Sequence, residues 1–210
     1  MADITFESPA QQSSPLAHFI SHYWRTMAVA LAALLLAAAG YAWYAASAQQ
    51  AKVKAENELG AIIAAQTGPE RLTALETYLK KAPASTKDAA LLEIARTAQD
   101  QQAFDKAAEA WNQLAITGPD GMRELAILGR ATALALGGDK AQGVKILADF
   151  LPKAPKAYRI VVARQLAGMA EEAQAWNEAL AAYQLLNDAA TGGIKPYYEA
   201  KVAEIKAKMN

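Results

Sequence analysis

The segment Met27-Ala-Val-Ala-Leu-Ala-Ala-Leu-Leu-Leu-Ala-Ala-Ala-Gly40 lies within a stretch, residues 26–50, that contains no charged residue. About 20 apolar residues in a helix are enough to cross the ~30 Å hydrocarbon layer of a bilayer. Aromatic residues flank the segment, as they do at membrane–water interfaces: Tyr23 and Trp24 before it, and Tyr41, Trp43 and Tyr44 after it. The sequence therefore predicts one transmembrane helix at residues 26–50, in contact with the lipid bilayer, after an N-terminal tail of residues 1–25.

Processing and orientation of this span are less well determined by the residues. Ala46-Ser47-Ala48 matches the small-residue pattern that signal peptidase cleaves, but the apolar run is longer than the 7–15 residues of a signal core. We therefore expect a retained anchor, with cleavage after Ala48 as the alternative. Arg25 precedes the span, and Lys52 and Lys54 follow it, so the Lys/Arg bias does not decide the orientation.

Composition narrows the chemistry of residues 51–210. This domain carries 20 Lys and Arg against 19 Asp and Glu, which gives no strong field for nucleic acid. The chain has no cysteine, and its two histidines, His18 and His22, both lie in the tail. Their spacing of four allows a metal site on one helix face, but no third ligand stands nearby, so interface residues are the favoured interpretation.

A period of 36 residues organises the domain. Pro83, Pro119 and Pro155 follow this period. Three further sets share it: the small residues Ala107, Gly143 and Ala179, the bulky residues Trp111, Leu147 and Tyr183, and the bulky residues Leu114, Phe150 and Leu186. In the tetratricopeptide repeat, which is two residues shorter, a small residue in the second helix lets the first approach closely. The pattern predicts the same kind of helix pair here.

The predicted fold is all-α, with one N-terminal transmembrane helix followed by a tetratricopeptide-like helical repeat solenoid. We place the helix pairs at about residues 52–81, 87–116, 122–151 and 157–190, and a capping helix at 196–208. Ser85 and Asp88 predict a capping box at the start of the second pair. The capping helix is expected to cover the open end of the stack, as terminal repeats must.

The first helices of such pairs line a concave groove, and their groove positions suggest a binding surface. The predicted groove has an apolar centre flanked by two arginines, and its residues are Leu92, Arg96, Leu125, Leu128, Thr132, Val161 and Arg164. Repeats that grip acidic C-terminal tails need Lys and Asn at the fifth and ninth positions of their first helices, and the fifth positions here are Leu92, Leu128 and Arg164. The groove therefore fits extended or partly unfolded polypeptide better. The alternative is that a neighbouring helix fills the groove.

Catalytic patterns are not found in the domain. It has no Gly-rich phosphate loop and no nucleophile elbow, and the adjacent carboxylates Glu171 and Glu172 are interpreted as solvated helix surface. Trp111 and Tyr183 occupy seam positions, so core packing is favoured over ligand stacking. We expect a protein that is not an enzyme and that needs no cofactor or metal.

Three segments carry a resemblance to a known family: Ala55-Glu-Asn-Glu-Leu-Gly-Ala-Ile-Ile-Ala64, Arg130-Ala-Thr-Ala-Leu-Ala-Leu-Gly-Gly-Asp139 and Ala175-Trp-Asn-Glu-Ala179. With the short acidic tail and single span, they resemble the YfgM family, whose members are ancillary subunits of the bacterial Sec translocon. The resemblance implies an inner-membrane protein with a cytoplasmic N-terminus and a periplasmic domain. It also implies contact with Sec subunits, emerging chains or periplasmic chaperones. The alternative is a repeat scaffold for another envelope assembly, such as cytochrome maturation or cell-wall machinery.

Overall fold

The computed structural model describes residues 15–209, with side chains from Trp24 onward, so residues 1–14 of the predicted tail lie outside the described part. No strand occurs within the described range, which confirms the all-α prediction. The elements in chain order are α1 (Pro15–Ala65), α2 (Gly68–Leu79), α3 (Ala84–Asp100), α4 (Phe104–Thr117), α5 (Met122–Leu136), α6 (Lys140–Phe150), the 3-10 helix η1 (Leu151–Lys153), α7 (Lys156–Glu172), α8 (Trp176–Ala189), the 3-10 helix η2 (Gly192–Ile194) and α9 (Lys195–Met209). The chain divides into two units, residues 1–51 and 52–210.

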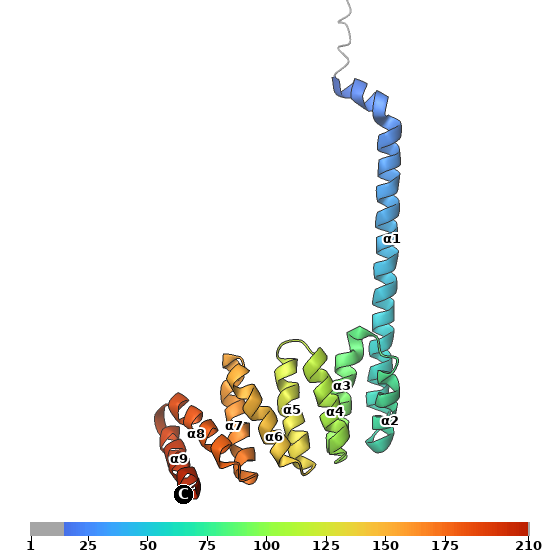
Figure 1. The fold of residues 1–210 in the computed structure, drawn as a ribbon. Coiled ribbons are helices and arrows are strands. Elements are labelled where there is room, and N and C mark those ends of the chain that lie inside the picture. Colours follow the sequence, from blue (N-terminus) through green and yellow to red (C-terminus); the bar gives the residue numbers. More distant parts are fainter. Residues whose placement is uncertain (1–14, 210) are drawn as a thin grey trace, which may run out of the picture. The chain divides into compact units, whose positions relative to one another are not determined.

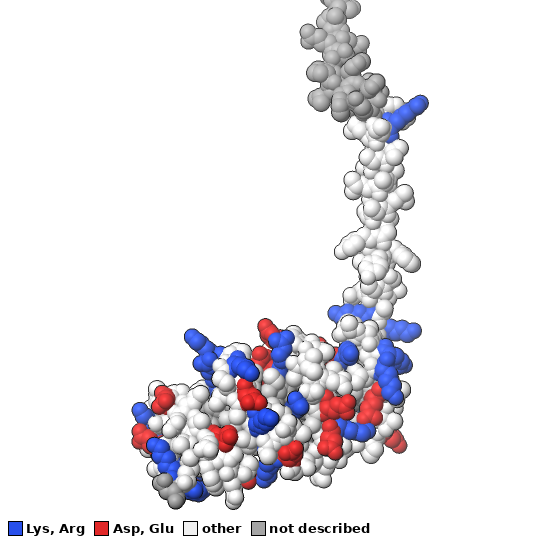
Figure 2. Space-filling model, viewed as in Figure 1, with Lys and Arg blue, Asp and Glu red and all other residues white. Residues whose placement is uncertain are grey.

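The described part of the first unit is the N-terminal stretch of α1. Every side chain from Trp24 to Ala51 is exposed, including the large leucines at 34, 35 and 36. The same apolar run could also belong to a core helix of a soluble protein, but such a helix would have most of these side chains covered, and here none is. Among the described helices, α1 alone is long and apolar enough to cross a membrane, although a signal sequence would meet the same criterion. Figure 2 shows the uncharged surface of this stretch beyond Arg25.

The second unit is a linear array of helices joined by short turns. From α2 to α9, each helix packs against the next one in the chain (Figure 1). Glycine ends some of these turns, and Gly138, with a φ of 102°, adopts the left-handed backbone that a side chain disfavours. Lys, Arg, Asp and Glu are interspersed over the visible face of the unit (Figure 2), consistent with its nearly balanced charge.

The core of the array follows the 36-residue period. Ala107 and Ala179 are completely buried, and Gly143 between them is buried as well. A Cβ atom added to Gly143 would lie 2.8 Å from the carbonyl oxygen of Ala131 and 2.6 Å from Sδ of Met169. The small residues therefore stand where helices make their closest approach. The seam residues of the period are buried too, except Phe150, which is half-buried: Trp111, Leu114, Leu147, Tyr183 and Leu186.

The starts of the helices differ from expectation in one place. Helix α3 begins at Ala84, with Pro83 as its N-cap and no side-chain cap, so the predicted capping box of Ser85 and Asp88 is wrong. The backbone oxygen of Pro83 instead accepts hydrogen bonds from the N–H groups of Thr86 at 3.0 Å and Lys87 at 3.1 Å. Asp88 instead accepts a hydrogen bond of 2.9 Å from the hydroxyl of Thr117 on α4.

The end of the array is closed by α9, which packs on α8 and buries Tyr198 and Ile205. Glu171 of α7 joins this contact, because it accepts hydrogen bonds from Lys201 at 2.9 Å and from the Tyr183 hydroxyl at 2.8 Å. The interpretation of Glu171 as solvated surface is therefore wrong, since its hydrogen-bond partners come from two other helices, α8 and α9. Partial burial alone would raise the pKa of Glu171, but the hydrogen bonds from Lys201 and Tyr183 outweigh it and lower that pKa.

Replacing Glu171 with glutamine should destabilise the fold at neutral pH and have less effect in acid. A carboxyl whose pKa is lowered by folding contributes stability above its unfolded value of 4.5, and this contribution is lost as the pH falls through the folded pKa. We expect the difference in melting temperature between wild type and Glu171→Gln to shrink between about pH 6.5 and pH 3. Glu172→Gln is the control, because the ion pair of Glu172 with Lys140 is exposed and should contribute at most about 1 kcal/mol. A pH-independent difference for Glu171→Gln would contradict the assignment.

Candidate functional site

The predicted binding surface lies on the first helix of three successive helix pairs. Helices α3, α5 and α7 carry all of its residues: Leu92 and Arg96; Leu125, Leu128 and Thr132; and Val161 and Arg164. Helices α5 and α7 contact each other directly. We call the exposed side of these three helices the first-helix face.

Five of the seven residues are accessible to different degrees. Leu125 is 47% exposed and Val161 is 49% exposed. These two residues are one 36-residue period apart on the contacting helices α5 and α7. Arg96 and Arg164 are exposed as well, and Thr132 is half-buried. The first-helix face thus offers two separate apolar side chains with an exposed arginine three residues after Val161.

The two remaining leucines do not form the expected apolar centre. Leu128 is only 8% exposed and belongs to the hydrophobic core of the C-terminal half, so its assignment to an open groove is wrong. Leu92 is half-buried and packs against the core of the N-terminal half. Counting groove positions along one helix could not reveal this, because burial depends on how closely the next first helix approaches.

Gln165 of α7 is a residue of this face that the sequence did not identify. Its side-chain amide donates hydrogen bonds to the backbone oxygen of Leu128 at 3.0 Å and to the hydroxyl of Thr132 at 2.6 Å. These bonds join α5 to α7 beside the buried Leu128. Gln165 directly follows a predicted groove position, and nothing else in the sequence marks it.

Arg96 lies in a polar hollow of about 520 Å³ rather than beside an apolar centre. Acidic, basic and uncharged side chains line this hollow together: Arg71, Glu93, Arg96, Thr97, Gln99, Asp100 and Trp111. One guanidinium nitrogen of Arg96 is 3.7 Å from a carboxylate oxygen of Glu93. Arg71 donates a hydrogen bond of 2.7 Å to the backbone oxygen of Gln66. With both signs of charge present and partly paired, the hollow has no strong preference for anions or cations.

Among the described residues, no three or more His, Asp or Glu side chains lie close enough together to hold a metal ion. The side chains of His18 and His22 lie outside the described set. The first-helix face can contact another chain through its exposed aliphatic groups, and its polar side chains and guanidinium groups can form hydrogen bonds with the backbone of that chain.

The comparison with known proteins covers the whole chain and therefore includes this site. Searches against protein-family models, curated proteins and solved structures found no match for this chain. The resemblance to the YfgM family therefore stays a prediction that rests on the three sequence segments and the layout of span and helices.

Proposed function

We propose that this protein is a non-enzymatic, single-span membrane adaptor whose tetratricopeptide-like domain binds extended or partly unfolded polypeptide at the first-helix face. The observation that carries the proposal is the pair Leu125 and Val161, each about half exposed at equivalent positions of two contacting helices. Aliphatic side chains that successive helices hold exposed at a fixed spacing can pack against apolar side chains of an extended or helical ligand. Arg164 favours polypeptide segments that also carry an acidic residue.

The tetratricopeptide-like description is supported by the period of the buried small residues. Ala107, Gly143 and Ala179 are 36 residues apart, and each lies in the second helix of a pair. Such arrays expose a long surface made of successive first helices, which suits an extended ligand. Because Leu128 is buried, the proposed surface consists of separate side-chain contacts instead of a continuous apolar channel.

Location and partners follow from the sequence resemblance. We propose an inner-membrane protein with a cytoplasmic N-terminus and a periplasmic domain, which works beside the Sec translocon or with periplasmic chaperones. Co-purification of the full chain after gentle detergent extraction tests the partner. Sec subunits in the eluate support this proposal, whereas components of cytochrome maturation or cell-wall synthesis support a scaffold function.

Replacing Leu125 and Val161 together with aspartate should weaken polypeptide binding by at least about tenfold, because it removes both apolar contacts and adds negative charge. The probe is a reduced and carboxymethylated protein that stays unfolded, titrated against the full chain in detergent. The double variant should melt near the wild-type temperature, since neither side chain belongs to the core.

The matched control is Ile116→Asp, an equally drastic change at a 72% exposed residue on α4. It should leave binding unchanged. If the double variant binds the unfolded probe as tightly as wild type does, the first-helix face is not the binding surface.

A further inference from the structure

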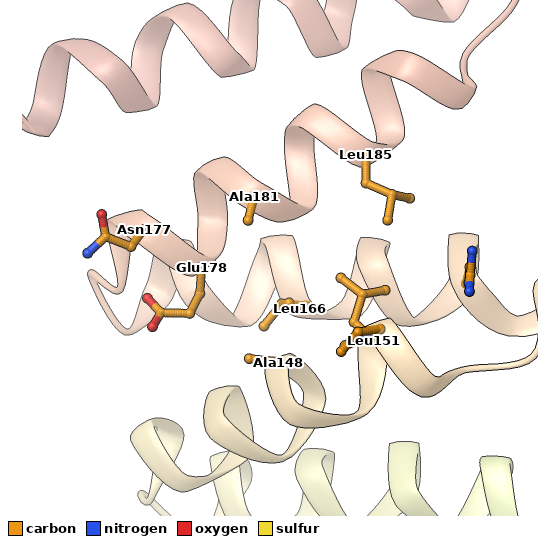
Figure 3. A pocket seen from close by; sticks show the side chains of 9 residues that line it. Ala148, Leu151, Leu166, Asn177, Glu178, Ala181 and Leu185 are labelled. Carbon is orange, nitrogen blue, oxygen red and sulfur yellow. The ribbon is translucent and has the colours of Figure 1, made fainter.

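A second hollow, of about 540 Å³, lies on the other side of α7 from the first-helix face. Its floor is Leu166, which is two residues after the exposed Arg164 and thus about 200° around the helix from it. Ala148 and Leu151 form one wall, and Ala181 and Leu185 of α8 form the other (Figure 3). We call this hollow the α6–α8 groove. Its centre is aliphatic throughout.

The α6–α8 groove has a counterpart two repeats earlier in the chain. A smaller hollow of about 280 Å³ is lined by residues that include Glu76, Leu79, Ile94 and Lys106. The residues 72 positions later, which is twice the 36-residue period, all line the α6–α8 groove: Ala148, Leu151, Leu166 and Glu178. The two hollows are therefore the same structural position with different side chains.

The difference between the two hollows is an ion pair. In the earlier hollow, Lys106 of α4 donates to a carboxylate oxygen of Glu76 on α2 at 2.6 Å and so connects the two walls. In the α6–α8 groove, Ala148 stands in place of Glu76, and Glu178 in place of Lys106. The walls are not connected there, and among the described residues no hydrogen bond or ion pair to the Glu178 carboxylate is present. The groove is consequently open, with a carboxylate available to a ligand.

Opposite charges stand at the two ends of the α6–α8 groove. Glu178 lies in the first turn of α8, and Arg159 lies in the first turn of α7, which packs against α8 after a short turn and therefore runs the other way. Figure 3 shows Asn177 and Glu178 at one end, and Leu151 and Leu185 toward the other. Arg159 donates from Nε to the backbone oxygen of Ala154 at 3.2 Å, which holds the side chain in place and leaves its terminal nitrogens as donors.

We propose that the α6–α8 groove binds a short segment of a partner polypeptide, with aliphatic side chains in the centre and a basic residue against Glu178. An acidic residue at the other end would meet Arg159. The eight residues from Glu178 to Leu185 span about 10 Å of helix, which matches about three residues of extended chain. Charge complementarity at both ends favours a polypeptide, because an apolar surface alone would not select a ligand with separated charges. The groove is a second site, independent of the first-helix face.

The test uses the full chain in detergent and two fluorescent peptides with a Leu-Val-Leu core, one ordered Lys-core-Glu and the other Glu-core-Lys. We expect wild type to bind one of the two peptides more tightly than the other. Glu178→Lys should weaken the tighter binding by about tenfold, because the attraction between Glu178 and the lysine of the peptide becomes repulsion. The double reversal Glu178→Lys with Arg159→Glu should then prefer the other order. Glu70→Lys, the same charge reversal at an exposed residue of α2 that does not line the groove, should leave peptide binding unchanged.

A second variant covers the possibility that a charge reversal perturbs folding. Ala181→Trp fills the groove from an exposed position and should abolish binding at an unchanged melting temperature, whereas Leu125→Asp with Val161→Asp should not affect these peptides. The proposal is overturned if wild type binds neither peptide, if Glu178→Lys binds as wild type does, or if Glu70→Lys weakens binding equally. Dimerisation of wild type that Ala181→Trp prevents, without peptide binding, would show instead that a second copy occupies the groove.

Discussion

Replacing Gly143 with alanine should lower the stability of the array by about 1–3 kcal/mol, the range typical of an extra group forced into a packed contact. The added Cβ would lie 2.8 Å from the backbone oxygen of Ala131, which cannot turn aside as a side chain can. Helix α6 would therefore have to move away from α5. Alanine also stabilises a helix by about 1 kcal/mol relative to glycine. The measured change in stability is therefore the cost of the close contact minus this gain in helix propensity.

The same substitution at Gly168 is the control for Gly143→Ala. Gly168 lies in α7, it is exposed, and a Cβ added there meets no atom within 4 Å. Gly168→Ala should therefore leave stability unchanged or raise it by up to about 1 kcal/mol, through helix propensity alone. Thermal unfolding of the full chain in detergent, followed by circular dichroism, measures both variants. Equal melting temperatures for the two would contradict the close packing at Gly143.

Deletion of residues 1–50 should move the protein from the membrane fraction to the soluble fraction. The exposed stretch of α1 is the one described segment that meets the length and hydropathy of a span, and both hydrophobic core clusters lie within residues 52–210. A milder change should act in the same direction: Leu34→Arg with Leu35→Arg adds about 2.5–3.5 kcal/mol of insertion cost per arginine. Val53→Arg, outside the predicted span, is the control and should leave the protein membrane-bound.

Alkaline extraction of membranes measures this anchoring directly. The wild-type chain should resist extraction, and its N-terminal tail should stay attached, because we expect no cleavage after Ala48. Recovery of a soluble wild-type chain that begins after Ala48 would show that the span is a signal peptide and would remove the anchor from the proposed function.

The sequence predicted features of the fold that depend on local spacing. The buried small residues Ala107, Gly143 and Ala179 were recognisable because a fixed period places each at the same point of a helix pair. The apolar span was equally recognisable, because it needs no partner to define it. The start of α3 was misplaced by a few residues, since proline and a capping box are competing ways to begin a helix.

Features that depend on contacts between distant helices were not predictable. Leu128 is buried in a core cluster that includes residues of α7, and Gln165, 37 residues later, donates to its backbone oxygen. No pattern within α5 predicts these contacts. Glu171 looked like a surface carboxylate, yet its partners Tyr183 and Lys201 come from α8 and α9. The α6–α8 groove was not predictable for the same reason. It is open because Ala148 and Glu178, 30 residues apart, replace the Glu76 and Lys106 that form an ion pair in the earlier hollow.

Site-specific photocrosslinking tests the proposed function most directly. A photoreactive amino acid is placed at Val161, on the first-helix face, or at Ile116, which is exposed on α4, in full chains reconstituted into lipid nanodiscs. The reduced and carboxymethylated unfolded protein is then added. We expect a strong crosslink from position 161, a weak one from position 116, and loss of the first when unlabelled unfolded protein competes. Equal crosslinking from both positions, or none from position 161, would contradict a polypeptide-binding first-helix face.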